Sequence, residues 1–556
     1  MKNNWFLQKN SNKQFNKVIS SEDAFSIIKN IAKKYGYKIY LVGGSVRDLI
    51  IGKKPKDYDF IVIKDDEAEK SAVNFVKHIA EDYNIKDYVL FEEFGVGKIK
   101  INNIEYEFII PRKESYIDSS RKPKIKYGTL EDDALRRDFT VNALYMDIFT
   151  NEIIDPTGKG LEDIKNKIIR TVDIDNPDRV FYEDPLRMLR AIRQSLSLGF
   201  ELDPKIKESI KRNINRLDIV SMERIRDEFA KILQLPKASK AIKLMEETGL
   251  LDKILPELKE TIGVKQNEEY HLEDVYEHIL NAIDNSNLEL TDRLVALLHD
   301  ISKPATKKII DNIVTFYDHE NVSAEMAKKI LERLKFPNHI IEEVYKRVKH
   351  HLVPHLYTKE WGDAKIRRLI NELGDLIYKI IEFAKVDIDS SISKKEKDYS
   401  KLHELKDRIE KQKELAEKAK KFKDIINGND LIKEFGIQEG PFIGELLKYA
   451  KELIEENPNI TKEDILNKIS EKYNLKRKSS FNIVSYITYI KNHKNSKGEP
   501  APWVIKSHKD GHIISSHKTR KEAEKHLKRI RYFKYKKSSL NCYNSNNWFI
   551  NETKIN

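Results

Sequence analysis

Two aspartates lie two residues apart at the start of an apolar segment in the first hundred residues. The segment, residues 60–63, is predicted to be a strand, and Asp57 and Asp59 lead into it. Alternate residues of a strand point to the same face, so the two carboxylates would repel each other unless a cation lay between them. Magnesium prefers oxygen ligands and shares its coordination shell with phosphates. The pair therefore predicts a Mg²⁺ site that also binds a triphosphate.

A glycine pair and an arginine come shortly before these aspartates. Gly43 and Gly44 follow the apolar residues 40–42, and Arg47 lies three positions later. Glycine allows a sharp turn and a close approach of the backbone to a ligand, and an arginine guanidinium can bind phosphate. We therefore predict a strand, a glycine turn, a short helix, a basic loop and a second strand over residues 40–63.

This combination of motifs resembles the signature of the polymerase-beta-like nucleotidyltransferases, and more narrowly that of the class II tRNA nucleotidyltransferase and poly(A) polymerase family. It consists of GGSVRD at residues 43–48 and DYD at residues 57–59. The resemblance implies an α/β head that uses Mg²⁺ and nucleoside triphosphates. It also implies a third carboxylate on a central strand, for which Glu107 is our candidate. Glu105, on the same face of the predicted strand 104–110, is the alternative.

Two further segments resemble parts of the same family. Residues 135–144, LRRDFTVNAL, are similar to the motif that contacts the sugar and triphosphate of the incoming nucleotide. The similarity implies nucleotide-binding roles for Arg137, Asp138 and Asn142. The basic, turn-rich residues 111–130 are similar to the flexible loop that closes over the nucleotide in the family.

A helix is predicted over residues 183–193, EDPLRMLRAIR. Steps of three residues place one aspartate and three arginines along one face of this helix. An Asp acceptor beside Arg donors suits the Watson–Crick edges of cytosine and adenine. The segment resembles the family motif in which side chains act as the template for base choice. We expect the first two of these residues to select the base and the last two to lie nearer the phosphates: Asp184, Arg187, Arg190 and Arg193.

A second group of candidate ligands lies in the helical part of the chain. His299 and Asp300 follow an apolar helix, and together with His278 and Asp387 they resemble the HD superfamily of metal-dependent phosphohydrolases. Two imidazoles and two carboxylates from separate helices can hold one divalent ion, which we expect to be a transition metal. Three further histidines are available for a second ion or for phosphate, and one aspartate competes with Asp387: His319, His350, His351 and Asp389.

The composition limits the class of protein. A chain of 556 residues predicts roughly three to five domains. A net charge of +12 and a pI of about 9.1 favour a polyanionic partner such as tRNA. The single cysteine, Cys542, excludes an intramolecular disulfide and a Cys-based zinc site and fits a reducing cytoplasm. No apolar run approaches the roughly 18 residues that span a bilayer, and the N-terminus lacks the apolar core of a signal peptide.

Helical periodicity dominates after residue 164, which predicts a multidomain chain with an α/β head and an all-α neck and body. The expected parts are an N-terminal arm, the nucleotidyltransferase head, a neck that binds nucleotide and RNA, an HD domain, a tRNA-binding helical tail and a small basic ββα module. Their expected bounds are residues 1–20, 21–155, 156–262, 263–425, 426–495 and 496–556. The family resemblance covers about residues 20–475. Basic and aromatic residues alternate in KHLKRIRYFKYKK, residues 525–537, which is compatible with RNA binding.

The sequence thus predicts a nucleotidyltransferase that adds CCA to the 3′ end of tRNA from CTP and ATP without a nucleic-acid template. A poly(A) polymerase, or an enzyme that adds only CC or only A, has the same chemistry and remains open. A third hypothesis is a phosphohydrolase whose working site is the HD domain and whose head only binds RNA. The intact acidic and arginine residues of the head argue against this third hypothesis.

Overall fold

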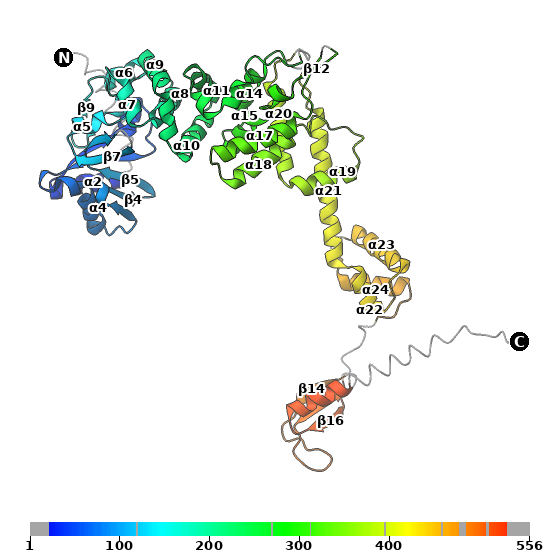
Figure 1. Ribbon diagram of the computed structural model, residues 1–556. Helices are drawn as coiled ribbons and strands as arrows, with labels where there is room; N and C mark the ends of the chain where they lie inside the picture. Colours follow the sequence, from blue (N-terminus) through cyan, green and yellow to red (C-terminus); the bar gives the residue numbers. More distant parts are fainter. Residues whose placement is uncertain are drawn as a thin grey trace. The chain divides into compact units, whose positions relative to one another are not determined.

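The computed structural model is shown in Figure 1. It describes residues 22–117, 120–267, 271–311, 313–393, 396–457, 460–477, 485–507 and 511–530. The expected N-terminal arm, Cys542 and the end of the basic segment at 531–537 lie outside the described residues. The chain divides into two compact units, Met1–Glu410 and Lys411–Asn556, and each is described by itself.

The head of the first unit is built on a seven-stranded mixed sheet in the order β3-β4-β5-β2-β1-β8-β9. Its central strands β1 and β2 are antiparallel, whereas β2 and β5 are parallel. The strands are β1 (Lys38–Val42), β2 (Tyr58–Ile63), β3 (Tyr88–Phe91), β4 (Val96–Ile101), β5 (Ile104–Ile109), β8 (Tyr145–Asp147) and β9 (Ile153–Ile154). This arrangement confirms the predicted α/β head.

Strand β2 is covered on both faces, and its alternation decides where the two aspartates point. Phe60 packs with the aromatic core beneath α2 (Glu22–Tyr35) and α4 (Ser71–Asp82). Ile61 belongs to a second buried cluster, whose other members include Tyr145 of the head and Val172 and Val180 of the neck. Since Asp59 shares the face of Ile61, its carboxylate points toward the neck.

The glycine turn forms as predicted between β1 and α3 (Gly44–Ile50). Gly43 has φ 75°, a left-handed conformation that disfavours any side chain. A Cβ atom there would lie 2.9 Å from Nη1 of Arg137. Glycine is therefore required both by the backbone and by the close approach of a candidate phosphate-binding side chain.

The segment expected as a closing loop is instead an antiparallel hairpin. Strands β6 (Arg112–Ile117) and β7 (Ser120–Tyr127) pair along most of its length. The segment is rich in lysine and serine and lacks the apolar alternation from which strands are predicted. Backbone hydrogen bonds can nevertheless hold two such strands together, so the hairpin was not predicted. The hairpin leads into α5 (Leu130–Leu135), which a capping box at Thr129 begins.

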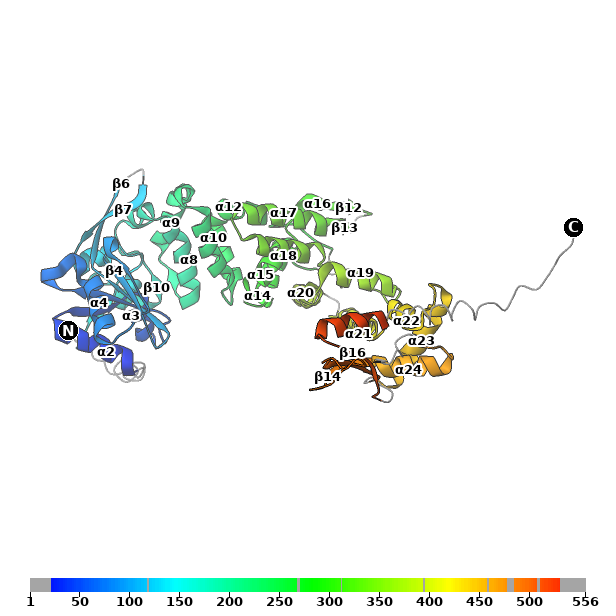
Figure 2. The ribbon, with the colours of Figure 1, turned by 90° about the horizontal axis from the view of Figure 1, so that it is seen from below.

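The neck consists of α6 (Gly160–Asn166), α7 (Pro177–Glu183), α8 (Leu186–Leu198), α9 (Pro204–Asn213), α10 (Met222–Leu233), α11 (Ala238–Glu247), α12 (Leu250–Ile254) and α13 (Pro256–Lys259). Helices α8 and α10 lie between the head sheet and the body helices in both views of the molecule (Figure 1, Figure 2). The helix predicted over residues 183–193 is wrong at its start. Asp184 is extended, with φ −137° and ψ 99°, and α8 begins at Leu186 because Pro185 provides its first turn.

The body continues the same helical packing. Its elements are α14 (Val275–Asn285), α15 (Leu290–Leu298), α16 (Lys303–Thr306), β12 (Lys308–Ile310), β13 (Ile313–Thr315), α17 (His319–Arg333), α18 (Asn338–Lys349), α19 (Asp363–Leu373) and α20 (Leu376–Ser390). Helix α14 packs against α11 of the neck and against α15 and α20. One buried hydrophobic cluster runs from the head through the neck to these helices. The predicted order of an α/β head followed by a helical body is therefore confirmed.

The second unit contains two small cores. Helix α21 (Ser400–Ile425) crosses the division between the units and is followed by α22 (Gly428–Phe435), α23 (Pro441–Glu456) and α24 (Lys462–Lys472). A separate sheet then forms from β14 (Ser485–Tyr489), β15 (Trp503–Ser507) and β16 (Ile513–His517), with a helix over residues 520–530. The predicted hairpin and helix are present, but the module has a third strand and begins before residue 496. Among the described residues, no helix has the length and apolar character that crossing a bilayer requires.

Candidate active site of the head and a second pocket in the body

A cavity of about 600 Å³ lies where the head meets the neck, and it gathers most of the residues predicted to bind nucleotide. The predicted residues in its lining are Gly44, Arg47, Asp57, Asp59, Arg137, Asp138, Asn142, Asp184, Arg187, Arg190 and Arg193. Gly43 adjoins Arg137, and Glu107 lies beside Asp59 on the neighbouring strand. Residues as far apart in the sequence as Gly44 and Arg193 thus contribute to one polar site.

The acidic residues lie on the two central parallel strands. Asp57 is exposed just before β2, and Asp59 is half-buried within it. The register pairs Asp59 with Glu107 of β5, which favours Glu107 over Glu105 as the third carboxylate. Burial, followed by the charge of Glu107, raises the pKa of Asp59 to about 6. Lys98 Nζ, 3.2 Å from Glu107 Oε2, offsets part of this negative charge.

Arg137 is held by a buried aspartate that the sequence reading missed. Its guanidinium lies 2.9 Å from Oδ2 of Asp133, and Tyr145 donates a hydrogen bond of 2.8 Å to the same oxygen. Arg136 contacts the other oxygen of Asp133 at 2.5 Å. Burial would raise the pKa of Asp133, but the charges of Arg137 and Arg136 lower it. Two arginines are therefore fixed at the cavity by one carboxylate.

Asp138 organises a second group of side chains. Arg190 donates two hydrogen bonds to its Oδ2, at 2.9 and 2.7 Å, and Asn142 donates one to its Oδ1 at 2.9 Å. Gln194 bonds to both Asp138 and Asn142, and Arg47 donates to Asn142 Oδ1 at 2.5 Å. Burial opposes the charged form, yet the charge of Arg190 and the hydrogen bonds hold the pKa of Asp138 well below its usual range. In this arrangement Asp138 positions Arg190 and Asn142, and its direct contact with a nucleotide stays a prediction.

The two predicted base-selecting residues come from the junction of α7 and α8. Arg187 is buried, and its guanidinium donates to the backbone carbonyls of Val180 at 3.2 Å and Arg136 at 2.5 Å. Asp184 accepts a hydrogen bond of 3.2 Å from Arg224 of α10. Arg224 was not predicted, because nothing in the sequence connects residues 40 positions apart on different helices. Both Asp184 and Arg187 nevertheless line the cavity.

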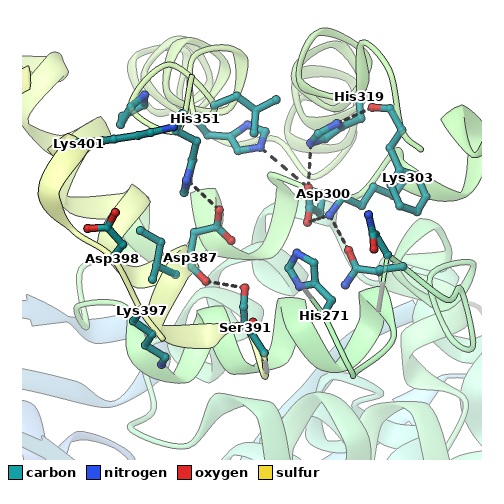
Figure 3. Close-up of a pocket in the computed structure, with 18 of the residues that line it drawn as sticks. His271, Asp300, Lys303, His319, His351, Asp387, Ser391, Lys397, Asp398 and Lys401 are labelled. Atoms are coloured by element: carbon teal, nitrogen blue, oxygen red, sulfur yellow. Dashed lines mark hydrogen bonds and ion pairs between the residues drawn. The ribbon is translucent and has the colours of Figure 1, made fainter. Parts of the chain in front are cut away.

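The predicted ligands of the body also come together. Asp300 and Asp387 line a pocket of about 550 Å³ (Figure 3). His278 and His299 lie against these two carboxylates. His278 Nε2 lies 3.2 Å from His299 Nε2, 3.6 Å from Asp300 Oδ2 and 2.9 Å from Asp387 Oδ1. Asp387 rather than Asp389 reaches this cluster, since Asp389 accepts a hydrogen bond from Tyr399 instead. These two residues are 200° apart around α20, so only one can face the pocket.

The remaining histidines separate into two groups. His319 and His351 are buried in the pocket beside Asp300, whereas His350 lies 3.3 Å from Glu372. His271, Glu273 and His355 also surround the cluster and were not predicted. His355 follows His351 by four residues in HLVPH, and this proximity in the sequence was the available signal for His355.

Three protein-family models match the chain. The model "Poly A polymerase head domain" matches residues 39–170. The model "Probable RNA and SrmB-binding site of polymerase A" matches residues 199–262, and the model "tRNA nucleotidyltransferase domain 2 putative" matches residues 306–469. The matches follow the order head, neck, body that the structure has.

Curated relatives cover most of the chain. An A-adding tRNA nucleotidyltransferase of Deinococcus radiodurans is 29% identical over 74% of this chain and 90% of its own length. A CC-adding tRNA nucleotidyltransferase of Thermus thermophilus is 27% identical over 76% of this chain and 91% of its own. A CCA-adding enzyme of Geobacillus sp. is 31% identical over 77% of this chain and 90% of its own. Taken with the acidic strand pair and the arginine-lined cavity, these matches place the chain in the tRNA nucleotidyltransferase family, and it is a nucleotidyltransferase.

Proposed function

We propose that the chain adds CCA to the 3′ end of tRNA from CTP and ATP, by two-metal nucleotidyl transfer. One observation carries the proposal: the carboxylates of Asp57 and Asp59 face a cavity whose other walls are supplied by arginines of the head and the neck. Carboxylates can hold cations and arginines can hold phosphates, so the cavity suits a metal-bound triphosphate.

The acidic residues fit a pair of magnesium ions. They offer hard oxygen ligands, and the raised pKa of Asp59 indicates that burial and the neighbouring Glu107 disfavour a bare negative charge there. Asp57, Asp59 and Glu107 would hold the ions. Ions held by these carboxylates would supply activation of the RNA 3′ hydroxyl and neutralisation of the triphosphate charge.

The arginines and the glycine turn position the nucleotide. Arg47 and Arg137 lie at the turn of Gly43, and Arg190 and Arg193 extend along α8, so both groups can bind phosphate oxygens. Their guanidinium groups are anchored by buried or half-buried acceptors, for example Arg193 by Glu228. An anchored donor loses little conformational entropy when it binds, which favours precise placement of the reacting phosphate.

Base choice is assigned to Asp184 and Arg187. Arg187 is fixed by backbone carbonyls, so any donor it turns to the cavity has a defined position. Asp184 provides an acceptor, and Arg224 orients it. Acceptor and donor together match the exposed edges of cytosine and adenine, and a fixed protein template explains selection without a nucleic-acid template.

A partial activity is the second candidate, because two of the relatives are named A-adding and CC-adding enzymes. The discriminating experiment uses one tRNA in two forms, the first lacking all three 3′-terminal nucleotides and the second lacking only the last. Each form is incubated with CTP, with ATP and with both. Full CCA activity predicts addition of two C residues and then one A to the first form. Addition of C alone, of A only to the second form, or of long A tails would overturn the proposal in favour of the corresponding alternative.

A further inference from the structure

The last described part of the chain folds into a module that none of the three family models covers. The third model ends at residue 469, whereas β14, β15 and β16 lie between residues 485 and 517. A helix over residues 520–530 packs on one face of this sheet through Ala523, Leu527 and Ile530 (Figure 1). The module formed by the three strands and this helix has a small core of its own, so its surface is an addition to the head, neck and body.

The module is strongly basic. Residues 485–530 contain eleven lysines and arginines and four aspartates and glutamates, whereas the whole chain has a net charge of +12. This short stretch therefore supplies more than half of the net positive charge of the chain. Such a concentration of charge on one small domain favours a polyanionic partner, and tRNA is the polyanion of the proposed function.

The helix of the module presents its lysines on the side away from the sheet. Ala523 and Leu527 face the sheet, and successive residues of a helix are about 100° apart. Three exposed lysines therefore lie within about 60° of one another on the outer side: Lys521, Lys525 and Lys528. In the described part of the module, the ion pairs are formed by Lys518 and Arg520 instead. The three ammonium groups are thus available to phosphate oxygens.

An aromatic pair adjoins this row of lysines at the end of β14. Tyr489 and Trp503 are paired on neighbouring strands, with their ring centroids 5.1 Å apart. The guanidinium of Arg520, which precedes Lys521 in the helix, lies 5.6 Å from the centroid of the Trp503 ring. Tyr489 is 55% exposed. An exposed aromatic ring beside cationic groups can stack on a nucleic-acid base while the cations bind the phosphates.

The opposite face of the sheet provides an internal control. Alternate residues of a strand point to opposite faces, so Tyr486 and its partner Lys506 point away from the helix. The loop between β14 and β15 reaches that face, where His493 Nε2 lies 2.8 Å from the hydroxyl of Ser516. Val504, on the same face, is fully buried. The chain itself thus partly covers this face, whereas the row of lysines on the helix is exposed.

We propose that the helix side of the module binds the backbone of RNA, with the three lysines at phosphates and one base stacked on Tyr489. The RNA is the tRNA substrate, so the inference rests on the proposed function in this respect. Lysine contacts to phosphate carry no sequence information, and a tyrosine ring stacks on any base. The module therefore increases the affinity for tRNA without taking part in base choice or in the chemistry of the head.

The first test measures binding of the full chain to labelled tRNA that lacks its 3′ end, by fluorescence anisotropy at several salt concentrations. Each lost phosphate contact lowers the slope of log K against log salt by about 0.7 to 0.9, so alanine at all three helix lysines should lower it by about 2 to 3. The matched control replaces three lysines of the loop and of the opposite face: Lys494→Ala, Lys497→Ala and Lys506→Ala. The control should retain the wild-type slope. An unchanged slope in the first triple variant, or equal losses in both, would overturn the proposal.

The stacking contact is tested with substitutions on the two faces of β14. Loss of an aromatic ring that stacks on a base weakens binding about 5- to 100-fold, which is the expected rise in Kd for Tyr489→Ala. Tyr489→Phe keeps the ring and Tyr486→Ala alters the other face, so both should bind tRNA like the wild type. Thermal unfolding checks that each variant is folded. Wild-type affinity in Tyr489→Ala, or an equal loss in Tyr489→Phe, would contradict the stacking contact.

Nucleotide addition separates this inference from the proposed function. Alanine at the three helix lysines should raise KM for tRNA and leave kcat unchanged, because the lost contacts are made equally in the ground state and the transition state. A wild type that binds tRNA through the module but adds no nucleotide would refute the proposed function alone. Addition with the same KM for tRNA in the wild type and the variant would refute the module as an RNA-binding surface and favour an acidic protein as its partner.

Discussion

The site of the head and the pocket of the body both bring carboxylates together, but they surround them with different partners. Asp57 and Asp59 lie at a cavity lined by arginines, and their carboxylates supply oxygen atoms as metal ligands. Asp300 is buried among imidazoles that are hydrogen-bonded to backbone carbonyls. Hard oxygen ligands with room for phosphate suit Mg²⁺, whereas a buried nitrogen-rich set suits a transition metal. One chain thus contains two clusters of candidate metal ligands, and we expect the two clusters to prefer different metals.

The largest effect is expected from Asp57→Ala or Asp59→Ala. Loss of a metal ligand should remove several kcal/mol of transition-state stabilisation, which corresponds to a fall in nucleotide addition of about a thousand-fold or more. Binding of tRNA should largely survive, and so should the hydrolysis that the HD resemblance predicts for the body. Asp65→Ala is the control, because Asp65 lies on the surface two residues beyond the other end of β2. Near-normal addition by either active-site variant would refute the two-metal assignment.

Base choice should change when the junction of α7 and α8 is altered. A hydrogen bond that involves a charged group contributes about 1.5–3 kcal/mol, so Asp184→Ala or Arg187→Ala should lower the preference for CTP and ATP over UTP and GTP roughly 10- to 100-fold. The rate with correct nucleotides should fall less. Arg224→Ala removes only the contact to Asp184 in the described network, and should give a smaller loss. Full selectivity in both template variants would show that base choice lies elsewhere.

The glycine turn offers a matched pair of substitutions. Gly43 and Gly36 have nearly equal φ, 75° and 77°, which disfavours alanine at both positions. At Gly43 the new Cβ also meets Arg137, whereas nothing lies within 4 Å at Gly36. We expect a raised KM for nucleotides in Gly43→Ala and an unchanged KM in Gly36→Ala. Equal kinetics in the two variants would exclude a role for the contact with Arg137.

The smallest effect on the head is expected from changes in the body. The double variant His299→Ala, Asp300→Ala should lose bound transition metal and hydrolysis, and keep nucleotide addition close to the wild-type rate. Some stability should be lost, because a ligand at 100 times its Kd stabilises the folded state by about 2.7 kcal/mol. Thermal unfolding with and without Mn²⁺ measures this contribution of bound metal to the stability of the folded state. A folded double variant that no longer adds nucleotides would show that the two sites are coupled.

Local patterns in the sequence predicted the elements that carry these sites, but not the contacts between them. The strand predicted over residues 104–110 forms as β5, which ends at Ile109, and motif order predicted both groups of candidate ligands. The choice of Asp387 over Asp389 was available, since Asp387 shares the helical face of the buried Phe383 and Ala384. Strand β14, SYITY, could also have been predicted from the sequence, because its residue types favour strands.

The sequence carries no comparable pattern for side chains that are far apart along the chain and meet only through tertiary packing. Nothing in the local sequence distinguishes Asp133 from other helix residues. Its role is visible only in the fold, where it accepts hydrogen bonds from Arg136, Arg137 and Tyr145. Arg224 reaches Asp184 only because α10 packs against α8. Such ion pairs depend on tertiary packing rather than on spacing along one element, so a single sequence does not specify them.

The central claim, two sites with separate metals, is tested most directly by metal add-back on one stripped preparation. The same sample is assayed for nucleotide addition to tRNA that lacks its 3′ end and for hydrolysis of p-nitrophenyl phosphate. The account predicts that Mg²⁺ alone restores addition and leaves hydrolysis absent, and that subsequent Ni²⁺ restores hydrolysis. Hydrolysis restored by Mg²⁺ alone, or addition that requires Ni²⁺, would contradict it.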